Sequence, residues 1–269
     1  MRLIAVLVLC IWVYAAMGPL TAQENSVLKR LNTADDTRGW EAVGRLELAG
    51  RGFCTGTLIT ERLVLTAAHC LFDRQSGERL PLDGIQFLAG WRDGRAAAYR
   101  KVRRAVPHPD YAFRGSDRIE TAAHDMALIE LDMPVRLPAI PPFPVSAPPH
   151  VGETVEMVSY AMDREEAPSL QERCHVLSAE RGLQVLSCDV DFGASGAPVF
   201  LLRDGVPTVA ALVSAKAEWR GQKVAIATTP EAHLPLLLSI LEGHAPPSGT
   251  QHTSAVEHRG ATGAKFVRP

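Results

Sequence analysis

The chain has 269 residues, more than one small domain needs, and 46% of them are hydrophobic, so it can bury a large core. Aromatic residues make up only 6%, so aliphatic side chains and alanine must supply most of the packing. The formal net charge is −2 at pH 7, and nothing in this balance indicates nucleic acid or an anionic membrane as a partner.

The first residues have the pattern of an export signal. Arg2 is followed by a nearly unbroken apolar run, Leu3 to Ala16, which is too short for a typical membrane span. Small residues follow, and we place the cleavage after Ala22. An uncleaved N-terminal anchor is the alternative. A signal peptide at residues 1–22 predicts a secreted or periplasmic protein with no stable membrane association after cleavage.

Cleavage leaves an even number of cysteines, Cys54, Cys70, Cys174 and Cys188, which favours disulfides in an exported protein. Four cysteines allow three pairings. We expect Cys54–Cys70 and Cys174–Cys188, because each bridge closes a short local loop, and each would stabilise the fold by about 3 kcal/mol. A metal site is the alternative, but no CxxC or HxxxH spacing supports it. We therefore expect no metal and no cofactor.

Residues 23–38 are polar and suggest a loose leader. Short apolar or alternating runs follow, with Gly or charged residues between them, and such runs predict strands. They are Ala42–Leu48, Gly56–Ile59, Leu63–Leu65, Gln86–Ala89, Ala96–Val106 and Met126–Leu131. Because long helical periodicity is missing, this half favours an all-β body of many short strands.

A proline-rich stretch from Pro134 to Pro149 interrupts the pattern and indicates an extended connector, because proline cannot sit in a central strand. The strand pattern then resumes. The second set is Thr154–Tyr160, His175–Leu177, Leu183–Cys188, Ala197–Leu202, Val206–Ala215 and Lys223–Thr228. Pro230–Leu241 has apolar residues at helical spacing and predicts one terminal helix. The tail, 243–269, is rich in Gly, Pro, Ser, Thr and His, which predicts disorder.

Three segments carry residue types suited to nucleophilic catalysis. They are TAAHC at Thr66–Cys70, HDMALI at His124–Ile129 and GASGAP at Gly193–Pro198. A serine nucleophile needs a base to take its proton and an acid to orient that base. His69, Asp125 and Ser195 would supply these three groups. Each segment alone is commonly structural, but the three together favour catalysis.

These segments resemble the trypsin-like serine peptidase family from about Trp40 to Leu241. The most specific part is CTGTLI at Cys54–Ile59 followed by LVLTAAHC at Leu63–Cys70. The resemblance implies an all-β fold of two packed six-stranded antiparallel β-barrels with a short C-terminal helix. The order His, Asp, Ser also argues against an α/β-hydrolase. The implied parts are an N-terminal barrel at 39–137, a linker at 138–149, and a C-terminal barrel with its helix at 150–242.

The resemblance also implies a role for each residue. His69 is the general base, Asp125 the buried acid and Ser195 the nucleophile. The backbone N–H groups of Gly193 and Ser195 would form the oxyanion hole, and Ser214 lies on the strand that would pair with the substrate backbone. The expected function is a secreted serine endopeptidase that acts on polypeptides as a monomer. The alternative is a non-catalytic trypsin-like fold that serves as a binding protein outside the cytoplasm.

The sequence departs from the family near the nucleophile. Ala194 replaces the Asp that binds the new N-terminus in animal trypsins, so activation by N-terminal insertion is not expected. In this respect the chain resembles the bacterial branch that includes glutamyl endopeptidases. Asp189 stands where trypsins place the acid that selects Arg or Lys, but Asp191 replaces the neighbouring half-cystine. Because Lys216 could neutralise Asp189, the substrate-binding set of Asp189, Ser214 and Lys216 leaves the residue preference open.

Overall fold

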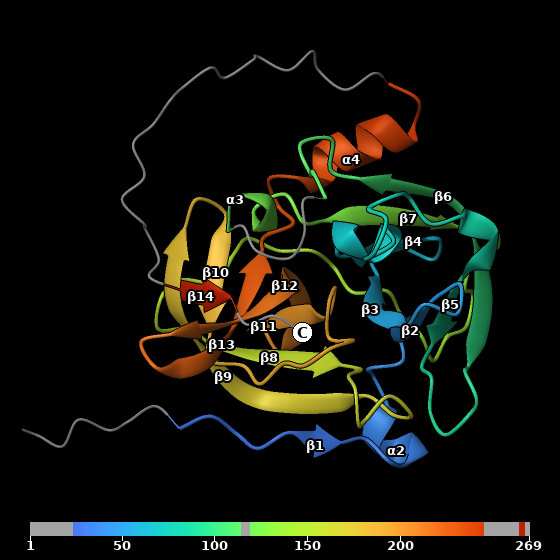
Figure 1. Cartoon of the computed structure of the whole chain (residues 1–269). Coiled ribbons are helices and arrows are strands. Elements are labelled where there is room, and N and C mark those ends of the chain that lie inside the picture. The colour runs from blue at the N-terminus through green and yellow to red at the C-terminus, as the bar shows by residue number, and fades with distance from the viewer. Residues whose placement is uncertain (1–23, 114–118, 245–263, 267–269) are drawn as a thin grey trace, which may run out of the picture.

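The computed structural model describes residues 24–113, 119–244 and 264–266. The expected signal peptide, residues 1–22, lies outside these ranges, as do residues 245–263 and 267–269 of the tail. Figure 1 shows two β-barrels, one built from each half of the chain. They confirm the expected all-β class with two six-stranded antiparallel barrels.

The first barrel closes in the strand order β2-β3-β4-β7-β6-β5. Its strands are β2 (Val43–Leu48), β3 (Phe53–Leu58), β4 (Leu63–Thr66), β5 (Ile85–Ala89), β6 (Ala98–Pro107) and β7 (Ala127–Leu131). Each overlaps one expected strand. Its short connecting helices are the 3₁₀ turns η1 (Ala68–Leu71) and η2 (Leu82–Gly84) and the helix α3 (Ile119–Ala122). Strand β7 is buried along its whole length, and Asp125, which lies just before it, is buried as well.

The second barrel closes through β8, β9, β10, β13, β12 and β11. Its strands are β8 (Thr154–Ser159), β9 (Ser169–Glu180), β10 (Leu183–Leu186), β11 (Pro198–Arg203), β12 (Val206–Trp219) and β13 (Gln222–Thr228). Strand β9 is much longer than the His175–Leu177 segment expected for it. The interior of the second barrel contains a separate apolar cluster of mostly small and β-branched side chains, contributed by several of its strands.

After the second barrel, the chain returns to the first barrel and then pairs once more with the second. Helix α4 (Leu234–Leu241) packs against β6 and β7, and its Leu237 and Leu241 belong to the larger core cluster (Figure 1). A further strand, β14 (Ala264–Phe266), pairs antiparallel with Ala217–Trp219 of β12. The disorder expected for the tail is therefore wrong for these three residues. Within the described ranges, no helix is long and apolar enough to cross a membrane.

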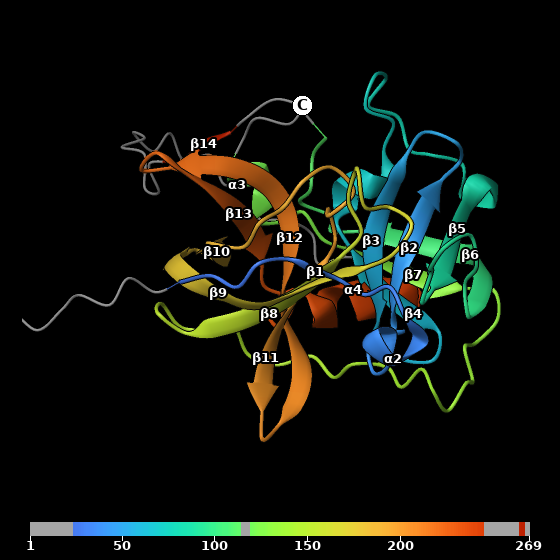
Figure 2. The ribbon, with the colours of Figure 1, turned by 90° about the horizontal axis from the view of Figure 1, so that it is seen from below.

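The N-terminal segment is attached to the second barrel, so the expectation of a loose leader is wrong for its described residues. Strand β1 (Lys29–Arg30) pairs antiparallel with β9, as Figure 2 shows along the lower face of that barrel. Leu31 follows it and is only 1% exposed. Helix α2 (Ala34–Thr37) comes next, and the Thr33 side chain caps its N-terminus. A buried leucine and a capped helix fix this polar stretch in place.

The proline-rich connector is fixed to both barrels. The ring of Phe143 lies 5.9 Å from Trp40 and 4.6 Å from Phe200 of β11, measured between centroids. The Phe143 N–H donates to the Leu58 carbonyl at 2.9 Å, and the Val209 N–H donates to the Pro144 carbonyl at 2.8 Å. The connector thus helps to hold the barrels in one fixed arrangement.

Candidate active site

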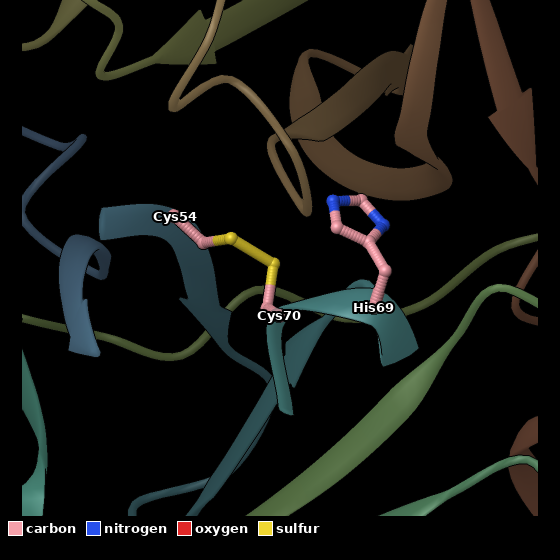
Figure 3. A group of neighbouring side chains, drawn as sticks. All are labelled: Cys54, His69 and Cys70. Carbon is pink, nitrogen blue, oxygen red and sulfur yellow. A yellow bond between two sulfur atoms is a disulfide. The ribbon is translucent and has the colours of Figure 1, made fainter. Parts of the chain in front are cut away.

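His69 lies on η1, directly after β4. A disulfide between Cys54 of β3 and Cys70 ties this turn to the barrel, and Figure 3 shows the imidazole beside the bridge, directed toward loops of the other half of the chain. Because the two sulfur atoms near His69 are bonded to each other, they are not available to a metal. The structure also contains the second expected bridge, Cys174–Cys188.

Asp125 lies just before β7 and is 4% exposed. Its Oδ1 accepts the backbone N–H of His69 at 2.9 Å, and its Oδ2 lies 2.7 Å from Nδ1 of the same residue. The hydroxyl of Ser214 donates to Oδ2 at 2.5 Å. A carboxylate facing Nδ1 favours the tautomer that carries its proton there, which leaves Nε2 as the acceptor. The imidazole is therefore oriented as a base.

The loop that carries Ser195 is bound to both barrels. Thr55 of the first barrel donates its N–H to the Ser195 carbonyl at 2.9 Å and its hydroxyl to the Gly193 carbonyl at 2.8 Å. The Gly196 N–H donates to the carbonyl of Val213, next to the serine that contacts Asp125, at 2.7 Å. These contacts bring Ser195 to the same interface as the His–Asp pair.

Two backbone donors in this loop have no protein acceptor among the described residues: the N–H groups of Gly193 and Ser195. The Ala194 N–H between them instead donates to the Asp191 carbonyl at 3.0 Å. Gly193 has φ +93°, and a Cβ there would lie 2.2 Å from the Phe53 ring, so the position requires glycine. Two available donors one residue apart are suited to bind a developing oxyanion.

No hydrogen bond between the Ser195 hydroxyl and the His69 ring occurs in the described part of the chain. Such catalytic hydrogen bonds are often long before substrate binds and shorten in the complex. The geometry thus joins His69, Asp125 and Ser214 by direct contacts, and it joins Ser195 to them through the backbone of its loop.

Lys216 does not pair with Asp189, so that expectation is wrong. The Lys216 ammonium lies 3.0 Å from Oδ1 of Asp191 and 3.8 Å from the centroid of the Phe192 ring. Burial raises the pKa of Asp191, but hydrogen bonds from the Phe192 N–H and Lys216 outweigh it, so that the pKa is lowered overall. Asp189 is exposed, and its N–H donates to the Gln171 side chain at 2.8 Å. Lys216 is therefore held by the Asp191 carboxylate and the Phe192 ring.

Arg164 is a charged residue beside this loop that the sequence did not indicate. Its guanidinium donates to the carbonyl and the hydroxyl of Ser159, both at 3.2 Å. Burial lowers the pKa of Arg164, while the negative charges of Asp189 and Asp191 act in the opposite direction. A single arginine in a polar turn forms no sequence pattern that could have predicted the position of Arg164 near Asp189 and Asp191.

A cluster of three histidines includes His124, which directly precedes Asp125 in the sequence. His108 follows β6, His124 follows α3, and His233 precedes α4. The ring centroid of His108 lies 4.7 Å from that of His124 and 4.6 Å from that of His233. His108 is 3% exposed, and burial together with the two neighbouring imidazoles lowers the pKa of His108 to about 4. Burial also lowers the pKa of His233.

Comparison with known proteins agrees with this architecture. The sequence model of the family described as the trypsin-like peptidase domain matches residues 54–212, more than half of the chain. Serine protease 56 of Mus musculus is 36% identical over 109 residues, which cover 40% of this chain and 16% of that protein. Mast cell protease 3 of Ovis aries is 35% identical over 96 residues, 35% of this chain and 34% of that protein. The matches therefore span only a minor part of each relative.

A solved structure described as a Glu endopeptidase in complex with MPD superposes with a TM-score of 0.66. The similarity covers 80% of this chain and 96% of that chain at 16% sequence identity, so it shows a shared fold. Since the family model covers more than half of the sequence and both barrels are present, the chain belongs to the family of trypsin-like peptidase domains.

Proposed function

We propose that this protein is a serine endopeptidase in which His69, Asp125 and Ser195 form the catalytic triad. The observation that carries the proposal is the hydrogen-bonded series from Ser214 through Asp125 to His69, with the Ser195 loop bound beside it. The three candidate residues lie within the segment that matches the family. The relatives named serine proteases support the same activity.

The proposed mechanism is acyl transfer through a covalent intermediate, as in other peptidases of this family. Ser195 Oγ attacks the carbonyl of the peptide bond while His69 Nε2 accepts its proton. Asp125 keeps the imidazole in the required tautomer and stabilises its charged form. The N–H groups of Gly193 and Ser195 stabilise the negative oxygen of the tetrahedral intermediate. His69 then gives the proton to the leaving amine, and water hydrolyses the acyl-enzyme.

We further propose that the protein acts outside the cytoplasm on polypeptides, as a monomer. Two disulfides are compatible with an oxidising compartment. The basic and apolar N-terminal sequence supports export by a cleaved signal.

Covalent labelling with a serine-directed fluorophosphonate tests the activity. The mature protein is expected to take up one label, at Ser195, because the probe needs an activated nucleophile and an oxyanion hole. Ser195→Ala is expected to remove the label, and Ser239→Ala in α4 serves as the matched control. A folded protein that takes up no label would instead support the alternative function, a trypsin-like fold that only binds a partner.

We propose that Asp189 gives a preference for Arg or Lys before the cleaved bond, because Asp189 is exposed and Lys216 is engaged by Asp191. Asp189→Ser is expected to lower kcat/KM for an arginyl substrate by about 10–100-fold, the effect of losing one charged hydrogen bond. Activity on an apolar substrate should change little, and Asp83→Ser is the exposed control. A peptide-library profile of the wild type with acidic or apolar residues at this position would contradict the assignment and indicate that Arg164 neutralises Asp189.

A further inference from the structure

The N-terminal segment, residues 25–31, lies along β9 of the second barrel (Figure 2) and reaches the loop that carries Asp189. We call this loop, residues 187–192, the pocket loop. Nδ2 of Asn25 donates to the Ser187 carbonyl at 2.8 Å, and the Ser187 hydroxyl donates back to Oδ1 of Asn25 at 2.6 Å. The segment is therefore bound directly to the first residue of the pocket loop.

Gln171 of β9 makes a second connection between the two, and this one is buried. Its side chain is 2% exposed. Nε2 of Gln171 donates to the Ser26 carbonyl at 3.0 Å, and Oε1 accepts the Asp189 N–H at 2.8 Å. Turning the amide over would set two donors against each other and two acceptors against each other, so the two contacts fix one orientation. Gln171 thus joins the N-terminal segment to the backbone of Asp189.

The other contacts of the pocket loop link this connection to the nucleophile. Cys188 lies between the two contact points, and its disulfide to Cys174 holds the same stretch. Further along, the Asp191 carbonyl accepts the Ala194 N–H at 3.0 Å, next to Ser195. The N-terminal segment and the nucleophile loop are therefore bound to opposite ends of the pocket loop.

We propose that Gln171 is a positioning residue for substrate recognition, which holds the backbone of Asp189 in place and is itself held by the N-terminal segment. The acceptor in that segment is the Ser26 main-chain carbonyl, so the connection requires neither an ion pair nor a new amino terminus. The proposal rests on the proposed function, in which Asp189 binds the Arg or Lys side chain. A binding group keeps its geometry only when the residues behind it are fixed.

Hydrogen exchange of the Asp189 amide measures the structural step independently of activity. Gln171→Met keeps the size of the side chain and removes both polar contacts, so exchange at Asp189 is expected to become roughly three- to tenfold faster. The protein that begins at Leu28 lacks Asn25 and Ser26 and should change in the same direction, because Gln171 then loses its anchor.

Two controls are matched to these changes. Gln184→Met alters another buried glutamine of the second barrel, on β10, and should leave exchange at Asp189 unchanged. The protein that begins at Asn25 keeps the contacts of the N-terminal segment and should behave like the protein that begins at Gln23.

Steady-state kinetics with arginyl and apolar substrates measure the functional step. In Gln171→Met and in the protein that begins at Leu28, the KM for the arginyl substrate is expected to rise roughly three- to tenfold, with kcat within about twofold. The KM for the apolar substrate and the rate of fluorophosphonate labelling at Ser195 should change far less, because neither depends on Asp189. A purely structural role would lower all these readouts together.

Unchanged exchange at Asp189 in both Gln171→Met and the protein that begins at Leu28 would overturn the proposal, and so would faster exchange with an unchanged KM for the arginyl substrate. Failure of the proposed function gives a different pattern: the wild type takes up no label or shows no preference for the arginyl substrate, while exchange at Asp189 still responds to Gln171→Met. The recognition role of Gln171 then falls with the proposed function, and only its contact with Asp189 is retained.

Discussion

Ser195→Ala is expected to lower kcat for peptide hydrolysis on the order of 10⁴-fold or more, because the covalent route loses its nucleophile. His69→Ala should cost about as much. The double variant should be little worse than either single one, because the residues act as a unit. The measurement is steady-state hydrolysis by purified protein, compared with Ser239→Ala as a matched serine control. Turnover within tenfold of the wild type in a clean Ser195→Ala preparation would falsify the catalytic assignment.

Asp125→Asn tests the same unit through its orienting member. Oδ2 of Asp125 accepts from two donors, Nδ1–H of His69 and the hydroxyl of Ser214. An amide NH₂ at this place would donate to His69 instead and select the wrong tautomer, so kcat is expected to fall by about 10⁴-fold. Asp110→Asn, which changes an exposed carboxylate outside the triad, is the control and should retain activity.

Gly196→Ala is expected to be the most destabilising single-methyl addition in the active-site loop. A Cβ at Gly196 would lie 2.3 Å from Oγ1 of Thr66, 2.4 Å from the Thr55 carbonyl and 2.8 Å from the Ala67 nitrogen. Two of these three atoms belong to the backbone and cannot move aside cheaply. Overpacking of about 1–3 kcal/mol and roughly 1 kcal/mol of backbone strain together predict a loss of about 2–4 kcal/mol.

The matched control is Gly205→Ala. Gly196 and Gly205 have nearly the same φ, +77° and +78°, but no heavy atom lies within 4 Å of a Cβ built at Gly205. The control isolates the backbone strain, so thermal unfolding should show a Tm decrease several times larger for Gly196→Ala. Activity per labelled site should also fall in Gly196→Ala, because the loop carries Ser195. Equal Tm decreases for the two variants would show that crowding at Gly196 is absent in solution.

The sequence predicted the number and the approximate ranges of the barrel strands, because each strand contains a short apolar or alternating run bounded by Gly or charged residues. Strand β9 was underestimated. Glu172 and Arg173 are exposed side by side in its middle, where the chain departs from strict alternation, and this break hid the first half of the strand. The attachment of the N-terminal segment was missed because its contacts with β9 are made by backbone groups and by polar side chains such as Ser26 and Gln171, which leave no apolar pattern in the sequence.

Contacts between distant residues account for the remaining differences. The pairing of Lys216 with Asp191, the approach of half-buried Arg164 to Asp189 and Asp191, and the histidine cluster all join residues that are far apart in the sequence. No local pattern records such approaches. The ordering of the Ser195 loop without an acid at Ala194 is similar, because the Asp191 carbonyl and the Thr55 side chain hold the loop from two sides.

The segment before the first barrel and the helix after the second barrel are exchanged between the barrels. Strand β1 comes before the first barrel in sequence but extends the sheet of the second, while α4 follows the second barrel and covers the first. Each half of the chain therefore covers part of the surface of the other half. No disulfide links the two halves, because Cys54–Cys70 lies within the first and Cys174–Cys188 within the second. Neither barrel would bury its apolar surface fully if produced alone. The nucleophile loop and the His–Asp pair thus belong to one cooperative folding unit, and they form or are lost together.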